Sequence, residues 1–441
     1  MPPSLRGIGG QRRAGTPAHL GLPPCANGDT IRAVIAVRLL VLALGVALGV
    51  FYPFIAVVLQ GFGFSAGEIG VIASIGAIGF TIAVPAWGHL ADVRLGRPRT
   101  LQICAIGAGL AIVALLLPWP ALVIAVLFAV FWVFESSWQP LTDAVTVNAL
   151  RGRDYGRVRL LTSLSFAIGT IVAGFIYNVT GYAAAFVLFG LAALSMAVIA
   201  ARVPDVDRAD LAAHARRAGT SGSGASRASW SGSAGVALRV APRLALVLTA
   251  ATLLFVGVIA GFTFLPLRLE AIGGSPSDIA LSSGLAAAAE IPTMLVAAAV
   301  ARIIGLRGMF VGSALIYAAA LAAWTVLDVP IAIIATRAFS GIGFAGVIVA
   351  VVLTIAALLP ADLQATGQSL FQTSAFGVAA IVANVVGGIL YDSLGHVAVF
   401  GLGAVMALAA ATLGWFVVPK GREAPPVPDP LSAQPGGGVA G

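Results

Sequence analysis

Charged residues are scarce in this sequence. They make up 10% of its 441 residues, whereas 59% are apolar and the mean hydropathy is +1.02. A soluble globular chain carries charge on roughly a quarter of its residues. This composition excludes an ordinary water-soluble domain, and we expect lipid to be the solvent for most of the chain.

Cysteine and lysine are also rare. Cys25 lies in a Pro-rich segment and Cys104 in an apolar run, so the two cysteines form neither a disulfide framework nor a set of metal ligands. We therefore expect no metal, no redox chemistry and no cofactor. Lys420 is the single lysine among 25 basic residues, a bias that, with many Ala and Gly residues, is typical of a GC-rich genome. The expected location is a bacterial cytoplasmic membrane.

The net charge of +8 does not indicate nucleic-acid binding. Such binding needs basic residues clustered on a folded, water-facing surface. Here the basic residues lie along the short joins between apolar runs. This distribution favours a membrane protein whose loops carry most of its charge.

Long apolar runs are the main feature that is present. A membrane helix needs roughly 20 mainly apolar residues, and these runs are too long for the strands of a membrane β-barrel. We predict an all-α membrane protein with twelve transmembrane helices near residues 33–59, 67–91, 100–117, 121–149, 158–179, 182–202, 245–270, 277–301, 308–327, 330–358, 363–391 and 395–418.

The basic residues orient these helices, because Arg and Lys in short loops stay on the cytoplasmic side of a membrane. If both termini are cytoplasmic, all the basic residues except Arg268 and Arg337 fall at the cytoplasmic ends of the helices or beyond them. A wrong number of helices would place the basic residues on both sides of the membrane. Their placement on one side therefore supports twelve.

Residues 204–243 interrupt the apolar pattern with charges and with a Ser/Gly/Ala-rich stretch from Gly219 to Gly235. This composition is typical of a flexible linker, here a cytoplasmic one. The linker separates six-helix bundles at 31–203 and 244–418, and we expect residues 1–30 and 419–441 to be disordered cytoplasmic tails. Two similar bundles suit a transporter that rocks one half against the other around a midplane site.

Charge inside a membrane is costly, so each ionisable residue there is a candidate functional group. Glu135, Gln139 and Asp143 are spaced four residues apart and would form one polar stripe on a continuous helix. We expect the stripe to face a water-filled interior. The structural alternative is a polar seam between helices.

Arg157 and Arg159 begin the fifth predicted helix. Both have an ordinary explanation as cytoplasmic anchors. Side chains two residues apart on a helix point about 200° away from each other, so one can reach lipid headgroups while the other turns inward.

Glu290 and Arg337 are the candidates in the second half. Glu290 lies in the middle of its predicted helix, just before Pro292, which weakens that helix locally. A carboxyl group that is protonated in one conformation and ionised in another is what proton coupling requires. Glu290, Asp143 and Glu135 are therefore the candidate proton carriers. A static Glu290–Arg337 pair that serves only the fold is the alternative.

Residues 88–99 read GHLADVRLGRPR. This segment resembles the G-x-x-x-D-x-x-G-R-[KR] loop of the major facilitator superfamily, with one additional residue between Asp92 and Gly96. The resemblance implies the superfamily's fold of two pseudo-symmetric six-helix bundles and a gating loop at Gly88, Asp92, Gly96 and Arg97. Gly88 would allow close helix contact, while Asp92 would cap a helix or pair with an arginine in one state.

Further segments are similar to the branch that contains the lactose permease and the phenylpropionate permeases. They are Pro140-Leu-Thr-Asp143, Tyr155-Gly-Arg157-Val-Arg159, the Glu290-Ile-Pro element and Phe51-Tyr-Pro-Phe54. This resemblance implies that Asp143 and Arg159 form a pair at the substrate site. With the other candidates, the expected substrate-binding set is Asp143, Arg159, Glu290, Arg337, Phe166 and Gln139.

The sequence also departs from the lactose permease. Arg337, Ser340 and Gly343 stand where that branch member has Lys, His and Glu, and Phe166 replaces a Trp that stacks on the galactoside. These departures put a galactoside substrate in doubt. The fifth helix, around residues 169–174, also lacks the Gly-Pro pair typical of proton antiporters.

We interpret the chain as a secondary transporter, most simply a monomeric proton-coupled symporter of a small organic solute that works by alternating access. Its partners would be the solute, protons and the lipid bilayer. A proton-coupled exporter of drugs or sugars is the alternative within this class, and a non-transporting membrane sensor is the alternative outside it. An enzyme is not expected, because no nucleophile elbow, metal set or His/Asp cluster occurs in the sequence.

Overall fold

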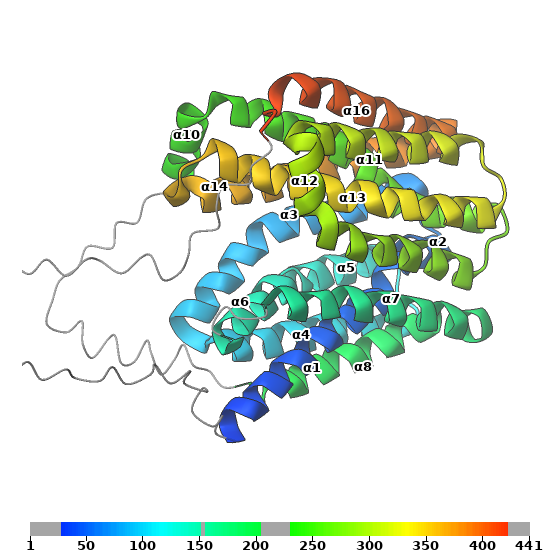
Figure 1. Cartoon of the computed structure of the whole chain (residues 1–441). Helices are drawn as coiled ribbons and strands as arrows, with labels where there is room; N and C mark the ends of the chain where they lie inside the picture. The colour runs from blue at the N-terminus through cyan, green and yellow to red at the C-terminus, as the bar shows by residue number, and fades with distance from the viewer. Residues whose placement is uncertain (1–27, 151–154, 204–229, 422–441) are drawn as a thin grey trace, which may run out of the picture.

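The computed structural model describes residues 28–150, 155–203 and 230–421. Over these ranges the regular elements are all helices, and they form two bundles that lie side by side (Figure 1). The first bundle comprises α1 (Gly28–Phe51), η1 (Tyr52–Phe54), α2 (Ile55–Gly61), α3 (Ala66–Leu90), η2 (Ala91–Leu95), α4 (Arg97–Val113), η3 (Ala114–Leu116), α5 (Ala121–Glu135), α6 (Trp138–Leu150), α7 (Tyr155–Thr180) and α8 (Ala183–Ala200).

The second bundle comprises α11 (Pro242–Ala271), α12 (Pro276–Val326), α13 (Pro330–Leu358), α14 (Ala361–Gln372), η4 (Thr373–Val378), α15 (Ala379–Leu394) and α16 (His396–Val417). A short helix, α10 (Trp230–Val240), precedes it and packs against α14 and α11. This helix falls in the last part of the segment predicted to be a linker. The rest of that segment, and most of both predicted tails, lie outside the described residues.

The prediction of twelve transmembrane helices is confirmed. Among the described residues, eleven helical stretches are long and apolar enough to cross a membrane. One of them, α12, contains 51 residues and turns back on itself at Gly305, which has a φ of +75°. Glycine suits this turn because other residues are strained at positive φ. The two arms of α12 therefore supply two crossings.

The two ends of the molecule differ in charge. One end, which we call the basic end, carries Arg94, Arg97, Arg99, Arg302 and Arg307 and lies on the left of Figure 1, where α1 begins and α16 ends. The opposite end, which we call the acidic end, carries Glu68, Glu270, Asp278, Asp328 and Asp392. Arg268, the basic residue that the predicted orientation left at this end, forms an ion pair with Asp328.

Small residues let the helices approach closely, as is common in membrane bundles. A Cβ atom at Gly45 of α1 would lie 2.4 Å from the Thr162 carbonyl oxygen of α7. In the second half, a Cβ atom at Gly341 of α13 would lie 2.2 Å from the Ala286 carbonyl oxygen of α12. Residues larger than glycine at these two positions would force the paired helices apart.

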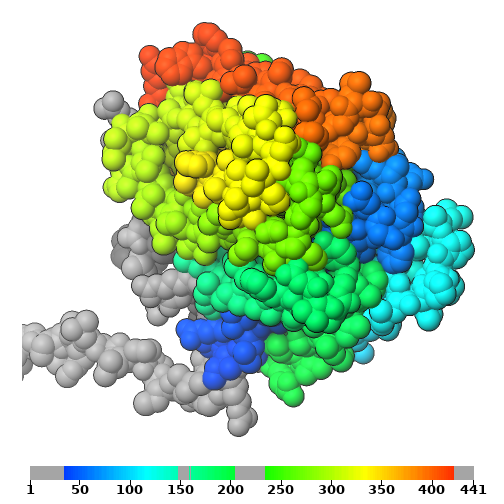
Figure 2. Space-filling model, turned by 90° about the vertical axis from the view of Figure 1, so that its right-hand side faces the viewer, coloured from blue at the N-terminus to red at the C-terminus, as the bar shows by residue number. Residues whose placement is uncertain are grey.

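The two halves meet at the acidic end. There α3 lies against α15 and α7 lies against α12, and the end of the first span, η1 and α2, contacts α11. Figure 2 views this end and shows the blue residues of α3 beside the orange residues of α15. Among the described residues, the hydrogen bonds that cross between the halves also lie here. In this conformation the acidic end is therefore closed.

Candidate functional site

The centre of the second half contains a buried cation, Arg337 of α13, which is 3% exposed. Its guanidinium lies over two aromatic rings, 5.6 Å from the ring centroid of Phe262 on α11 and 5.5 Å from that of Trp324 on α12. Such cation–π contacts stabilise a charge that has lost its water. The Nη1 atom donates to the Ser340 hydroxyl at 3.0 Å, while Nε has no partner.

Trp324 is held in place by its own hydrogen bond. Its indole Nε1 donates to the Thr336 hydroxyl of α13 at 2.8 Å. Thr336 in turn donates to the carbonyl oxygen of Ile333 on the same helix, at 2.6 Å. The ring that covers Arg337 is thus fixed by the helix that carries Arg337.

Glu290 of α12 shares this region with Arg337. The charges of the two side chains interact, and the Tyr317 hydroxyl of the second α12 arm interacts with both. Glu290 forms no ion pair at contact distance with any described residue. The structure therefore brings the predicted residues Glu290 and Arg337 together without locking them into a static pair.

A second cluster occupies the first half and depends on a break in the first span. Pro53 has no N–H group, so the Gly49 carbonyl loses its helical partner and the chain forms η1. Thr170 of α7 donates to this carbonyl oxygen at 2.9 Å, and Tyr177 donates to that of Val50 at 2.7 Å. The broken segment is therefore fixed on α7, and it carries Tyr52.

The Tyr52 hydroxyl interacts with the carboxyl group of Glu135, which is 8% exposed at the end of α5. The ring of Tyr52 also packs edge-on against Trp132, with 5.6 Å between centroids. Glu135 is thus a buried carboxyl group that faces the first span.

The predicted polar stripe lies on the fourth span, which has a local break. The span expected at 121–149 is confirmed as one apolar helical stretch, Ala121–Val147, with a two-residue turn at Ser136 and Ser137 between α5 and α6. Pro140 explains the break, because it has no N–H group for the Ser136 carbonyl and its ring crowds that carbonyl. Gln139 and Asp143 remain together on α6, where the amide donates to the carboxylate at 3.0 Å.

Two predicted substrate residues lie on α7. The Arg159 side chain is outside the described part of the structure, so the predicted pair with Asp143 stays a prediction. Phe166 is half-buried, and its backbone lies against Gly45 and Gly49 of α1.

The predicted gating loop lies at the basic end. Arg97 Nε donates to the Asp92 carboxylate at 3.2 Å, and Gly96 has a φ of +81°. Residues Ala91–Leu95 form a π-turn in which the Gly96 N–H bonds to the Ala91 carbonyl. This wider turn accommodates the additional residue of the motif. The close helix contact expected at Gly88 is not formed here, since a Cβ atom there would meet nothing within 4 Å.

The corresponding turn of the second half, at Gly305, has no Asp beside it. Instead, the backbone after α16 supplies the acceptors. Leu306 N–H donates to the Gly421 carbonyl at 3.1 Å, and Arg307 Nε donates to the Val418 carbonyl at 2.9 Å. In the second half, main-chain carbonyl oxygens accept the hydrogen bonds of the turn at Gly305. In the first half, the Asp92 carboxylate accepts the hydrogen bond of Arg97.

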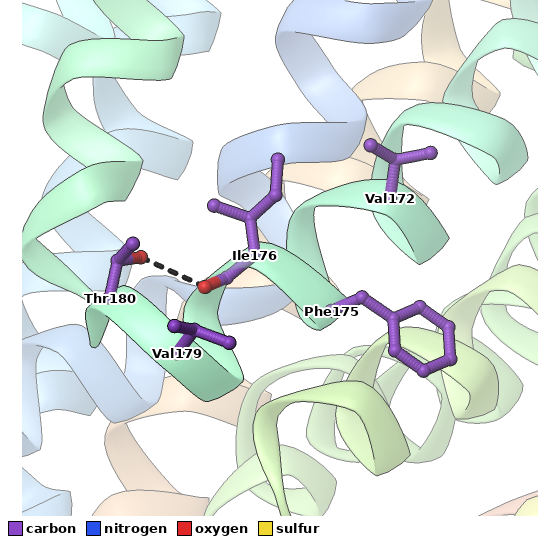
Figure 3. A pocket seen from close by; sticks show the side chains of 5 residues that line it. All are labelled: Val172, Phe175, Ile176, Val179 and Thr180. Atoms are coloured by element: carbon purple, nitrogen blue, oxygen red, sulfur yellow. Dashed lines mark hydrogen bonds between the residues drawn. The ribbon is translucent and has the colours of Figure 1, made fainter.

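One surface hollow lies on α7, away from the Glu290–Arg337 and Tyr52–Glu135 clusters. It has a volume of about 500 Å³ and is lined by Val172, Phe175, Ile176, Val179 and Thr180, all on α7 (Figure 3). The Thr180 hydroxyl is occupied by a 2.9 Å bond to the Ile176 carbonyl. An open apolar surface of this kind suits lipid chains rather than a polar solute.

No group of three His, Cys, Asp or Glu residues in the described ranges is placed to hold a metal ion. The polar clusters instead offer hydrogen-bond donors and acceptors, which include a guanidinium group and carboxyl groups, with aromatic rings beside them. Sequence reasoning missed Phe262, Tyr317 and Trp324, and it noted Tyr52 only as part of the Phe51–Phe54 element. Each is one aromatic residue among many in apolar runs, and only the packing of distant segments places it beside a charge.

Two helical halves with ionisable side chains buried inside them are the architecture of a secondary transporter. The chain belongs to the MFS_1-like family, whose model matches residues 40–402. It is therefore a multi-pass membrane protein of the major facilitator superfamily.

Individual relatives agree with this assignment. The chain is 28% identical to the maltose permease of Geobacillus stearothermophilus over 350 residues, which are 78% of this chain and 84% of the permease. The fold is similar to the solved structure of the nucleoside transporter NupG, with a TM-score of 0.69 at 14% identity, covering 89% of this chain and 98% of that one. It is also similar to a D-xylose-proton symporter, with a TM-score of 0.65 at 15% identity, covering 89% and 97%.

Proposed function

We propose that this protein is a proton-coupled symporter that imports a small, polyhydroxylated organic solute. The observation that carries the proposal is the arrangement of Glu290, Tyr317 and Arg337, in which the carboxylate and the cation interact without forming a contact ion pair. A carboxyl group in this position can exchange its proton when the halves move. The protein moves its substrate and does not change it chemically.

The solute class follows from the groups that are present. Hydroxyls, an amide and carboxylates next to aromatic faces bind sugar-like molecules, whose hydroxyls both donate and accept hydrogen bonds. The names of the relatives, a maltose permease, a nucleoside transporter and a xylose-proton symporter, support this class. The similarity of the Asp143 and Arg159 segments to the lactose permease branch supports a site that extends into the first half.

The distribution of charge supports a cell-membrane protein with the basic end in the cytoplasm. Both described chain ends, at α1 and α16, lie at that end. We propose that a single copy carries out the whole cycle, since the two halves together provide both clusters.

The test is uptake by proteoliposomes with an inward-directed proton gradient. Sugars, nucleosides, aromatic acids and drugs are supplied one at a time, after a thermal-shift screen of the purified protein. The proposal predicts uptake of a polyhydroxylated solute that stops when an ionophore collapses the gradient. Export driven by the same gradient would show an antiporter, and ligand-dependent stability without flux would show a sensor.

A further inference from the structure

The closed acidic end is held by two hydrogen-bonded contacts that are related by the pseudo-symmetry of the halves. In the first, the Asp392 carboxylate at the end of α15 accepts from the N–H groups of Ala66 and Gly67 on α3, at 3.0 and 2.7 Å. In the second, Asn178 at the end of α7 accepts from the Ser277 N–H group of α12 at 3.1 Å. The Asn178 amide also donates to the Ser277 hydroxyl at 2.9 Å. We call these the Asp392 clasp and the Asn178 clasp.

The sequence shows that the clasps are counterparts. Tyr177-Asn178 and Tyr391-Asp392 are each followed by a glycine with positive φ, Gly181 at +74° and Gly395 at +78°. The helices that they bind are also alike: both α3 and α12 start with a capping box, Ser65 with Glu68 and Ser275 with Asp278. Each half therefore contributes one clasp side chain and one helix N-terminus.

The side chains of the two clasps differ in one atom, because Asp392 has a second carboxylate oxygen where Asn178 has an amide nitrogen. Asp392 is ionisable, and Asn178 is not. As a carboxylate, Asp392 accepts two backbone N–H groups and places a negative charge at the positive end of the α3 helix dipole. A protonated carboxyl group has lost that charge and turns one oxygen into a donor, so at most one of the two bonds persists.

We propose that the two clasps gate the acidic end, and that protonation of Asp392 releases one of them while the Asn178 clasp stays indifferent to pH. Release would favour opening toward the medium from which a proton symporter loads. This gating does not depend on Glu290 being the coupling residue. Asp392 and Asn178 are positioning residues here, because they act on the conformation and do not touch the solute.

Other charged groups lie at the acidic end, and any test must distinguish their effects on opening from the effect of Asp392. They are Glu68 on α3, Arg268 and Glu270 on α11, Asp278 on α12, Asp328 in the α12–α13 connection, and His396 on α16. Glu68 is bound to the Ser65 N–H group at 2.9 Å, and Arg268 is paired with Asp328. Within the described residues, none of these side chains forms a hydrogen bond or ion pair with Asp392.

The experiment measures opening directly by the distance between spin labels on the two halves. Gln60→Cys on α2 and Val329→Cys in the α12–α13 connection are both exposed positions at the acidic end. The labels are placed in full-length protein from which both native cysteines have been removed. Gly70→Trp provides the open reference, because a Cβ atom at Gly70 would lie 2.1 Å from the Asn384 carbonyl oxygen when the end is closed.

In the unaltered protein, we expect the open fraction to rise as the pH is lowered from about 8 to about 4, because the Asp392 clasp is complete only while its carboxylate is ionised. Asp392→Asn should raise the open fraction at the alkaline end of this range roughly tenfold, the effect of losing a charge-assisted hydrogen bond, and should flatten the pH response. The exchange variant with Asn178→Asp and Asp392→Asn should regain a pH response. The reason is that the carboxyl group introduced at position 178 can accept from both the Ser277 N–H group and its hydroxyl only when it is ionised.

Each of these measurements is repeated with Glu290→Gln, so that a pH response caused by the proposed coupling residue is removed. A response that persists in the Asp392→Asn variant would overturn the proposal. So would an open fraction that does not change with pH in the unaltered protein.

Discussion

Glu290 and Arg337 interact through their charges from adjacent helix segments without forming an ion pair at contact distance. Arg337 is instead supported by neutral groups: two aromatic rings, the Ser340 hydroxyl and Tyr317. These neutral groups stabilise the buried Arg337 cation without an ionised Glu290. Glu290 can therefore change its protonation state while Arg337 stays buried. This relationship is the basis of the proposed coupling mechanism.

The first prediction concerns Tyr317. Tyr317→Phe removes the hydroxyl that interacts with Arg337 and keeps the ring. Removing a polar partner of a buried charge costs roughly 1 to 3 kcal/mol, so we expect a lower thermal unfolding midpoint and a solute affinity about tenfold weaker. Tyr391→Phe is the control, because Tyr391 stacks on Phe264 away from Arg337. Equal solute affinity in the two variants would show that Tyr317 is not part of the solute-binding site.

The second prediction concerns the first half. Asp143→Asn and Arg159→Ala should each abolish solute binding while the protein still inserts and folds. The reason is that a pair at the substrate site contributes through its charges, and either change leaves one charge without its partner. Binding is measured by thermal shift with the solute found above. Arg153→Ala is the control for loss of an ordinary cytoplasmic anchor, and an equally severe loss in that variant would favour the anchor role for Arg159.

The third prediction concerns the gating loop. Asp92 and Arg97 are partly exposed, so their pairing contributes at most about 1 kcal/mol to stability. Asp92→Asn should therefore leave the unfolding midpoint and the equilibrium affinity nearly unchanged and should slow turnover, because the loop lies at the basic end and away from the buried clusters. Affinity lost at unchanged turnover would place the gate elsewhere.

Much of the fold was predictable from the sequence, because apolar runs must be helical in lipid. The predicted helix at 330–358 coincides with α13 (Pro330–Leu358), whose ends are marked by Pro330 and Pro360. The two-residue turn at Ser136 and Ser137 within the fourth span was not predicted, although Pro140 accounts for it. A proline removes the hydrogen bond to the carbonyl four residues earlier, so the position of Pro140 indicates such a local break.

The site was predictable only in part. Ionisable residues inside apolar runs stand out, which is why Glu290, Arg337 and Glu135 were recognised. Their aromatic partners do not stand out, because a residue such as Phe262 lies far from Arg337 in the sequence, in a run of apolar residues. The two clasps were missed for another reason: each joins side chains and backbone groups of opposite halves, and no local pattern reports such a contact.

The most direct test of the coupling mechanism is Glu290→Gln, which keeps the shape of the side chain and mimics its protonated form. In proteoliposomes, we expect this variant to exchange solute across the membrane at a rate close to that of the unaltered protein. It should lose accumulation of the solute against its gradient when a pH gradient is the driving force. If Glu290→Gln still concentrates the solute, Glu290 is not the coupling residue, and the mechanism proposed for Glu290 and Arg337 is contradicted.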